Sequence, residues 1–166
     1  MKRKIPLLLI ALLAAAFLLR AIFFFQYKQV WWDGAVYLGM GKYIFSSGTA
    51  GIWEPIRPLV LPFILGLGWK LGLNQVIFGK ILIVTISLCI ILMTYLVARR
   101  FATERAALIA AAITAFFPVF FLFSFRIYTE MPSVLFALMA LYWFRKDTLL
   151  FSGLLAALAT MTRFHE

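Results

Sequence analysis

Long apolar runs separated by short cationic turns constrain this chain more than any other feature of its sequence. Of its 166 residues, 65% are apolar and only 13% are charged, against about 25% charged in an average soluble domain. A soluble fold of this length could not hide that much apolar surface. The sequence therefore predicts an all-α integral membrane protein with about five membrane-spanning helices.

The apolar segments are measured against a hydrocarbon core of about 30 Å, which about 20 helical residues can cross. The first, Ile5 to Phe25, is interpreted as a signal anchor. A signal peptide cleaved near Ala14–Ala16 is the alternative, but the apolar run continues beyond the alanines. The other expected spans, of which the last two are short, are Val76 to Val97, Ala106 to Phe125, Met131 to Phe144 and Leu149 to Met161.

Cationic clusters beside the spans predict how the chain is oriented in the membrane. Lys2–Lys4, Arg99–Arg105 and Arg145–Lys146 fall at alternate turns, so the positive-inside rule puts them and the amino terminus in the cytoplasm. We expect the plasma membrane of a prokaryote, or the endoplasmic reticulum of a eukaryote. Because the net charge of +10 is spread between apolar runs, membrane lipids and phosphates are expected partners, and nucleic acid is not.

With this orientation, residues 26–75 form a first outer loop that is long for a connection. Asp33 to Ser47 is predicted to be a surface helix, with Asp33 as its N-cap and Gly48 as its C-cap. The apolar stretch Pro58 to Leu73 cannot cross, since both of its ends must lie outside. Its prolines and glycines, with Trp69 and Lys70, predict a second, interfacial or re-entrant helix.

Asp33 and Tyr37 are the most suggestive residues of this loop. They are four residues apart and share one helix face. Burial beside Trp31 and Trp32 would make the Asp33 carboxylate a better general base. The alternative is that Asp33 only caps its helix, while the tryptophans belong to an interfacial belt.

Other charged residues are also expected on the outer side. Glu54 and Arg57 lie in a proline-fixed turn and form either a solvated ion pair or a phosphate site centred on Arg57. Glu130 lies just before Pro132, at the expected start of a helix, and compensation of the helix dipole is enough to explain its charge. His165 is a weak candidate metal ligand, because one histidine cannot make a metal motif.

The order of motifs resembles the amino-terminal part of membrane glycosyltransferases of the GT-C class, in particular the protein O-mannosyltransferase and lipid A aminoarabinose transferase families. No nucleotide-binding motif is present, which also favours a lipid-carried donor. The resembling motifs run in order across nearly the whole chain. They are Trp32–Tyr37 (WDGAVY), Arg57–Leu59 (RPL), Leu96–Phe101 (LVARRF), Tyr128–Pro132 (YTEMP) and Gly153–Arg163 (GLLAALATMTR).

The resemblance implies a polyprenyl- or dolichyl-phosphate sugar donor and inverting transfer on the non-cytoplasmic face. Asp33 matches the catalytic aspartate of these families. Where members often carry a second carboxylate, this chain has Gly34, which leaves the use of a divalent metal open. The resemblance also implies cations for the lipid phosphate, for which Arg57, Arg126 and Arg163 are candidates, and Tyr37, Glu54 and Glu130 are further substrate-binding candidates.

The relatives usually have more spans than this chain. We therefore expect residues 1–166 to be one transmembrane module of a longer transferase, which would need its missing carboxy-terminal part or a partner subunit for activity. A rival interpretation is a small transporter subunit or assembly partner whose outer charges line a permeation path. Against the rival, the polar residues at mid-span are sparse and neutral, as at Thr85 and Ser87.

Overall fold

The computed structural model describes residues 6–163, and this part of the chain is helical, with no strand. It confirms the predicted all-α class. A short 3-10 helix, η1 (Lys146–Thr148), lies between the last two α-helices. The α-helices are α1 (Leu7–Phe23), α2 (Trp32–Phe45), α3 (Val60–Lys70), α4 (Gln75–Phe101), α5 (Glu104–Phe116), α6 (Pro118–Phe123), α7 (Glu130–Trp143) and α8 (Leu149–Thr162).

The number of membrane spans is only partly supported. Within residues 6–163, α4 is the one helix long and apolar enough to cross a membrane by length and composition. Its 27 residues correspond to about 40 Å of helix. The other apolar helices are shorter, with 17 residues in α1 and 14 in α7, so five spans remain a prediction.

The predicted caps of α2 are wrong at both ends. The N-cap is Trp31, which makes no side-chain cap, and Asp33 lies within the first turn. The C-cap is Ser46, followed by Ser47 at φ 55°, and the Gly48 N–H donates to the Tyr43 carbonyl over 3.0 Å. This is a Schellman ending in which Ser47 takes the left-handed position after the C-cap, and Gly48 after it also has a positive φ, of 84°.

Pro118 divides the span predicted from Ala106 to Phe125 into α5 and α6. The residue before a proline is pushed out of the helical region, and Phe117 accordingly has ψ 122°. Pro118 then opens α6 at the position where a missing N–H costs least. The sequence therefore yields two short helices at an angle instead of one continuous span.

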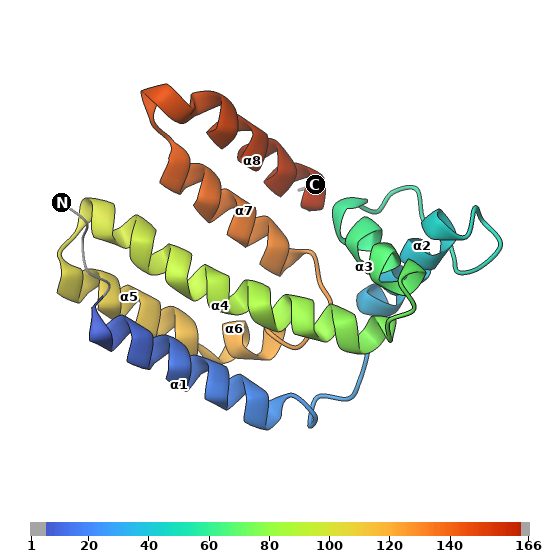
Figure 1. Cartoon of the computed structure of the whole chain (residues 1–166), viewed down its shortest axis with the longest axis horizontal. Coiled ribbons are helices and arrows are strands. Elements are labelled where there is room, and N and C mark those ends of the chain that lie inside the picture. Colours follow the sequence, from blue (N-terminus) through green and yellow to red (C-terminus); the bar gives the residue numbers. More distant parts are fainter. Residues whose placement is uncertain (1–5, 164–166) are drawn as a thin grey trace.

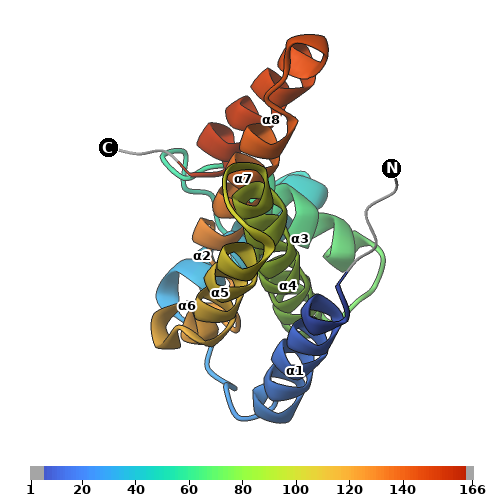
Figure 2. The ribbon, with the colours of Figure 1, turned by 90° about the vertical axis from the view of Figure 1, so that its left-hand side faces the viewer.

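Helix α4 is the centre of the packing, with α1 on one side and the α7–α8 hairpin on the other (Figure 2). One core cluster joins α4 to α2, α3 and α7, and includes Met40, Leu65 and Ile83. A second joins α4 to α1 and α5, where the alanines at 107, 111 and 115 recur every fourth residue. Such small residues let two helices pack closely, which stabilises helix pairs in a membrane, where the hydrophobic effect does not drive them together.

Helices α2 and α3 form a compact pair beside the first turn of α4, while the α4–α5 turn lies at the other end of the molecule (Figure 1). A Cβ on Gly66 would come within 2.3 Å of the Gly41 carbonyl oxygen, so the pair depends on two glycines at their crossing. Gln75 fixes it to α4, since its amide donates to the carbonyls of Leu38 and Leu65 over 3.0 and 3.3 Å.

Candidate functional site

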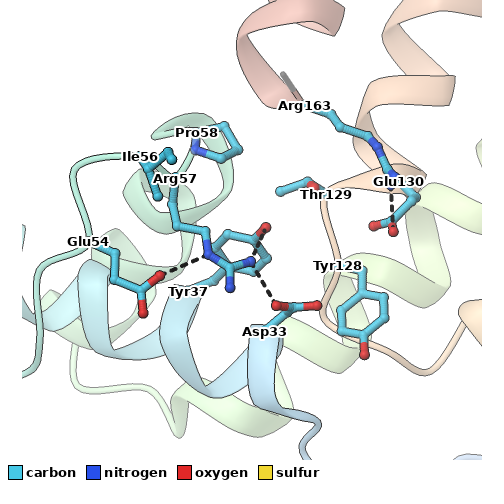
Figure 3. A pocket seen from close by; sticks show the side chains of 10 residues that line it. All are labelled: Asp33, Tyr37, Glu54, Ile56, Arg57, Pro58, Tyr128, Thr129, Glu130 and Arg163. Atoms are coloured by element: carbon cyan, nitrogen blue, oxygen red, sulfur yellow. Dashed lines mark hydrogen bonds and ion pairs between the residues drawn. The ribbon is translucent and has the colours of Figure 1, made fainter. Parts of the chain in front are cut away.

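A pocket of about 390 Å3 opens where the start of α2, the α2–α3 loop, the start of α7 and the end of α8 meet (Figure 3). We call it the Asp33 pocket. It lies at the α2–α3 end of the molecule, away from the cationic α4–α5 turn. Its lining consists of Asp33, Tyr37, Glu54, Ile56, Arg57, Pro58, Tyr128, Thr129, Glu130 and Arg163.

Arg57, in the α2–α3 loop, contacts three other side chains of the pocket. Its Nη1 donates to Asp33 Oδ1 over 2.7 Å and to the Tyr37 hydroxyl over 3.4 Å, while its Nε donates to Glu54 Oε2 over 2.9 Å. Burial alone would lower the pKa of Arg57, but the hydrogen bonds to Glu54, Tyr37 and Asp33 outweigh it and raise this pKa above its ordinary value. Arg57 therefore stays charged and anchors two carboxylates.

This arrangement favours the ion-pair interpretation of Glu54 and Arg57 over a phosphate site. A guanidinium shared by two carboxylates has no spare positive charge to offer an anion. Local backbone supports the pair, since the Arg57 N–H donates to the Glu54 carbonyl over 3.2 Å. Arg57 thus holds the α2–α3 loop onto α2.

Asp33 presents its carboxylate from the first turn of α2 toward the pocket. Its side chain is 41% exposed, so the burial expected beside the tryptophans is not found. Arg57 binds Oδ1, and among residues 6–163 no side chain or backbone group donates to Oδ2. One oxygen is therefore fixed in position while the other faces the pocket and is available to a hydroxyl group.

A second ion pair closes the opposite wall. Arg163, after the last turn of α8, forms an ion pair with Glu130, with 2.5 Å between Nη1 and Oε1. Glu130 does lie in the first turn of α7, where its charge suits the helix dipole, but it is also bound to Arg163. The pocket lining contains three carboxylates against two guanidinium groups, which does not favour a bound phosphate.

Arg126 lies outside the lining of the pocket. Its guanidinium is stacked over the Trp31 ring at 4.1 Å and lies 5.4 Å from the Phe123 ring. In the described part of the chain it forms no ion pair. Of the three arginines proposed for an anion, it is therefore the one that no described carboxylate neutralises.

Sequence reasoning did not single out Tyr128 and Thr129 as site residues. Both line the pocket, and Thr129 is only 4% exposed. Burial, followed by the negative charge of Asp33, raises the pKa of the Tyr128 hydroxyl above its ordinary value. The sequence signal that could have pointed to these two residues is Arg126, because residues that follow a candidate cation in the same loop lie near it.

A metal site finds no support among residues 6–163, where no three His, Cys, Asp or Glu side chains come together. Asp33 and Glu54 are both bound to Arg57, and Glu130 is bound to Arg163. His165 lies outside the described residues.

The family model of the dolichyl-phosphate-mannose-protein mannosyltransferases matches residues 56–166. The chain belongs to this family. It is thereby placed with membrane-associated glycosyltransferases of the mannosyltransferase kind, which points to a lipid-linked sugar donor. Neither the curated proteins nor the solved structures give a match.

The matched region covers one side of the pocket more fully than the other. Of the pocket's charged and tyrosine lining residues, Arg57, Tyr128, Glu130 and Arg163 lie within residues 56–166, while Asp33, Tyr37 and Glu54 precede them. Asp33 is nonetheless bound directly to the matched Arg57 over 2.7 Å. The geometry thus connects the candidate base to the region that carries the family match.

Proposed function

We propose that the Asp33 pocket transfers a sugar from a polyprenyl- or dolichyl-phosphate donor to an acceptor hydroxyl on the non-cytoplasmic face of the membrane. The observation that carries this proposal is the pairing of Asp33 with Arg57, which fixes a half-exposed carboxylate in a pocket built mainly from family-matched residues. The proposal includes the five-span topology and cytoplasmic amino terminus inferred from the cationic turns.

In this mechanism Asp33 acts as the general base. Its free oxygen accepts the proton of the acceptor hydroxyl as the hydroxyl oxygen bonds to the anomeric carbon of the sugar. The bond from that carbon to the phosphate oxygen breaks on the opposite side, which inverts the anomeric centre. The electron pair leaves with the lipid phosphate, and the proton stays on Asp33.

Arg126 is the proposed partner of the departing lipid phosphate. Its guanidinium is anchored by stacking on Trp31, the residue directly before α2. It has no carboxylate partner among residues 6–163. A fixed cation of this kind stabilises charge that develops on a leaving group. Arg57 and Arg163 then orient carboxylates rather than hold the donor.

Photo-crosslinking with a lipid-phosphate sugar that carries a diazirine on the sugar ring tests the location of the site. We expect label on peptides containing Tyr37, Arg57 or Tyr128, and its loss when excess unmodified donor competes. Label confined to the cationic turn at Arg99–Arg105 would contradict the proposal. Label spread along the α1–α4 interface would instead favour the transporter interpretation.

A donor-binding assay tests the phosphate role separately. Arg126→Met is expected to weaken donor binding by about tenfold or more, because charge-assisted hydrogen bonds to phosphate are lost. Lys28→Met is the matched control, since Lys28 is another cation of the first outer loop that lies outside the pocket lining. Equal donor binding by the Arg126→Met protein and the parent would remove Arg126 from the mechanism.

A further inference from the structure

Arg20 is a fully buried arginine in α1, inside the segment predicted to cross the membrane. Its acceptors are neutral. Nε donates to Ser87 Oγ over 2.9 Å and to Ser124 Oγ over 3.2 Å, Nη1 to the Ala16 carbonyl over 3.1 Å, and Nη2 to the Ala115 carbonyl over 3.4 Å. No described carboxylate pairs with it.

A charge at this depth is costly, because lipid and apolar side chains cannot replace its hydration. An arginine kept in such a position is by default a functional feature. The Asp33 pocket does not include Arg20, and no other described pocket reaches it. Its role must therefore be sought in what its hydrogen bonds hold together.

One of these bonds closes the end of α5. Pro118 has no N–H and stops α5 at Phe116, so the last carbonyls of the helix lose their intrahelical donors. The Ala115 carbonyl belongs to this last turn and accepts from Arg20 instead. A cation at a helix carboxyl end is also favoured by the helix dipole.

The other contacts of α1 reach the far end of α6. Ser124 directly follows α6, and the Arg20 guanidinium lies within 5.7 Å of the Phe120 and Phe121 rings. Farther along, the Tyr27 ring stacks on Phe125 at 4.7 Å. The α6–α7 loop, residues 124–129, thus begins on Ser124, which is bound to α1, and on Phe125, which is stacked on the chain just after α1.

We propose that Arg20 is a positioning residue, which bridges the break between α5 and α6 and thereby holds the α6–α7 loop in the wall of the Asp33 pocket. Tyr128 and Thr129 are the loop residues that line this pocket. The consequence for sugar transfer rests on the proposed function, whereas the consequence for the loop does not.

Thiol labelling in an otherwise cysteine-free chain, with Cys89→Ala, tests this proposal. Thr129→Cys reports on the loop, and Thr162→Cys on α8 is the matched control, since both threonines are buried at 4% and 0% exposure. In Arg20→Met we expect Thr129→Cys to react about tenfold faster or more with an aqueous thiol reagent, because the loop opens locally. Thr162→Cys should keep its protection.

Unchanged protection of Thr129→Cys in Arg20→Met would overturn the proposal. Equal loss of protection at Thr162→Cys would also overturn it, because Arg20 would then serve the whole fold. Arg20→Lys should restore part of the protection, since lysine keeps the charge but donates with a different geometry. Should Arg20→Met not fold, Ser124→Ala is expected to raise Thr129→Cys labelling several-fold, and no rise would contradict the proposal.

A transfer assay on the same variants separates the two proposals. If Arg20 positions the loop and the pocket is catalytic, Arg20→Met lowers the turnover rate and Arg20→Lys recovers part of it. If labelling shows the opened loop while transfer stays normal, the positioning role of Arg20 stands and the proposed function of the pocket fails.

Discussion

At the residue scale, Arg57 organises the Asp33 pocket by donating to Asp33 from one nitrogen and to Glu54 from another. Lysine keeps the charge but lacks this planar fork. We expect Arg57→Lys to lower the transfer rate by about tenfold to a hundredfold through misplacement of Asp33. The free energy of unfolding should fall by only about 1 kcal/mol or less, since the carboxylates are partly exposed.

Steady-state transfer and thermal unfolding in detergent measure the two effects. Arg99→Lys is the control, because Arg99 pairs with Glu104 at 3.7 Å at the other end of α4. This control should transfer at the parent rate. Full activity in Arg57→Lys would show that the fork between the two carboxylates is not needed.

Tyr128 offers a pH-dependent test of the same pocket. Burial first, and then the charge of Asp33, raises the pKa of its hydroxyl. Asp33→Asn removes the charge that repels the phenolate, so the pKa of Tyr128 should fall, while burial still holds this pKa above its ordinary value. The difference in phenolate absorbance between each protein and its Tyr128→Phe variant gives this titration. An unchanged midpoint would show that the Asp33 charge does not reach Tyr128.

At the element scale, the crossing of α2 and α3 sets the position of the Asp33 helix. A methyl group on Gly66 would collide with the Gly41 carbonyl, whereas nothing lies within 4 Å of a Cβ on Gly153 in α8. We expect Gly66→Ala to destabilise the protein by about 1–3 kcal/mol. Gly153→Ala, the matched control, should stabilise α8 by about 0.5–1 kcal/mol.

Thermal unfolding of both variants in one detergent checks this prediction. The two changes add the same methyl group to a helix interior, so their difference isolates the crossing. If Gly66→Ala were as stable as Gly153→Ala, α2 and α3 could not be packed as closely as described.

The sequence predicts the existence and order of the helices well, because apolar runs and turn residues act locally. It predicts the ends of α2 less well, since Trp31 precedes the helix and Ser47 takes a conformation usually given to glycine. The break at Pro118 was missed, although a proline within an apolar run is a direct signal. The apolar run around Pro118 is long enough for one membrane span, and its length hides the break.

At the scale of the whole molecule, the cationic turns and the Asp33 pocket lie at opposite ends of α4 (Figure 1). Arg100 stacks on the Tyr142 ring at 3.9 Å and ties the last turn of α4 to the end of α7. The proposed topology places this end in the cytoplasm and the pocket outside.

Two exposed threonines provide a matched test of this topology, Thr49 after α2 and Thr103 before α5. In a Cys89→Ala background, an impermeant thiol reagent applied to intact cells should label Thr49→Cys. Thr103→Cys should react only after the membrane is permeabilised. Strong labelling of Thr103→Cys in intact cells would invert the orientation.

Most of the candidate site could be named from the sequence, but the only pairing that the sequence suggests is that of Glu54 with Arg57, as one of two alternatives. Asp33 and Arg57 are 24 residues apart, and Glu130 and Arg163 come from different helices. Such contacts depend on how α2, α3, α7 and α8 pack, which local patterns do not encode. Arg20 was overlooked although a charge inside an apolar run is itself a signal.

The transfer rate of Asp33→Asn tests the central claim most directly, measured in the natural protein with saturating donor. Asparagine preserves the size of the side chain but cannot accept the acceptor proton. We expect the rate to fall by about 10² to 10⁴, with donor binding retained and with normal transfer by the control Asp147→Asn in the cationic α7–α8 turn. Near-normal transfer by a well-folded Asp33→Asn protein would contradict the assignment of Asp33 as the base.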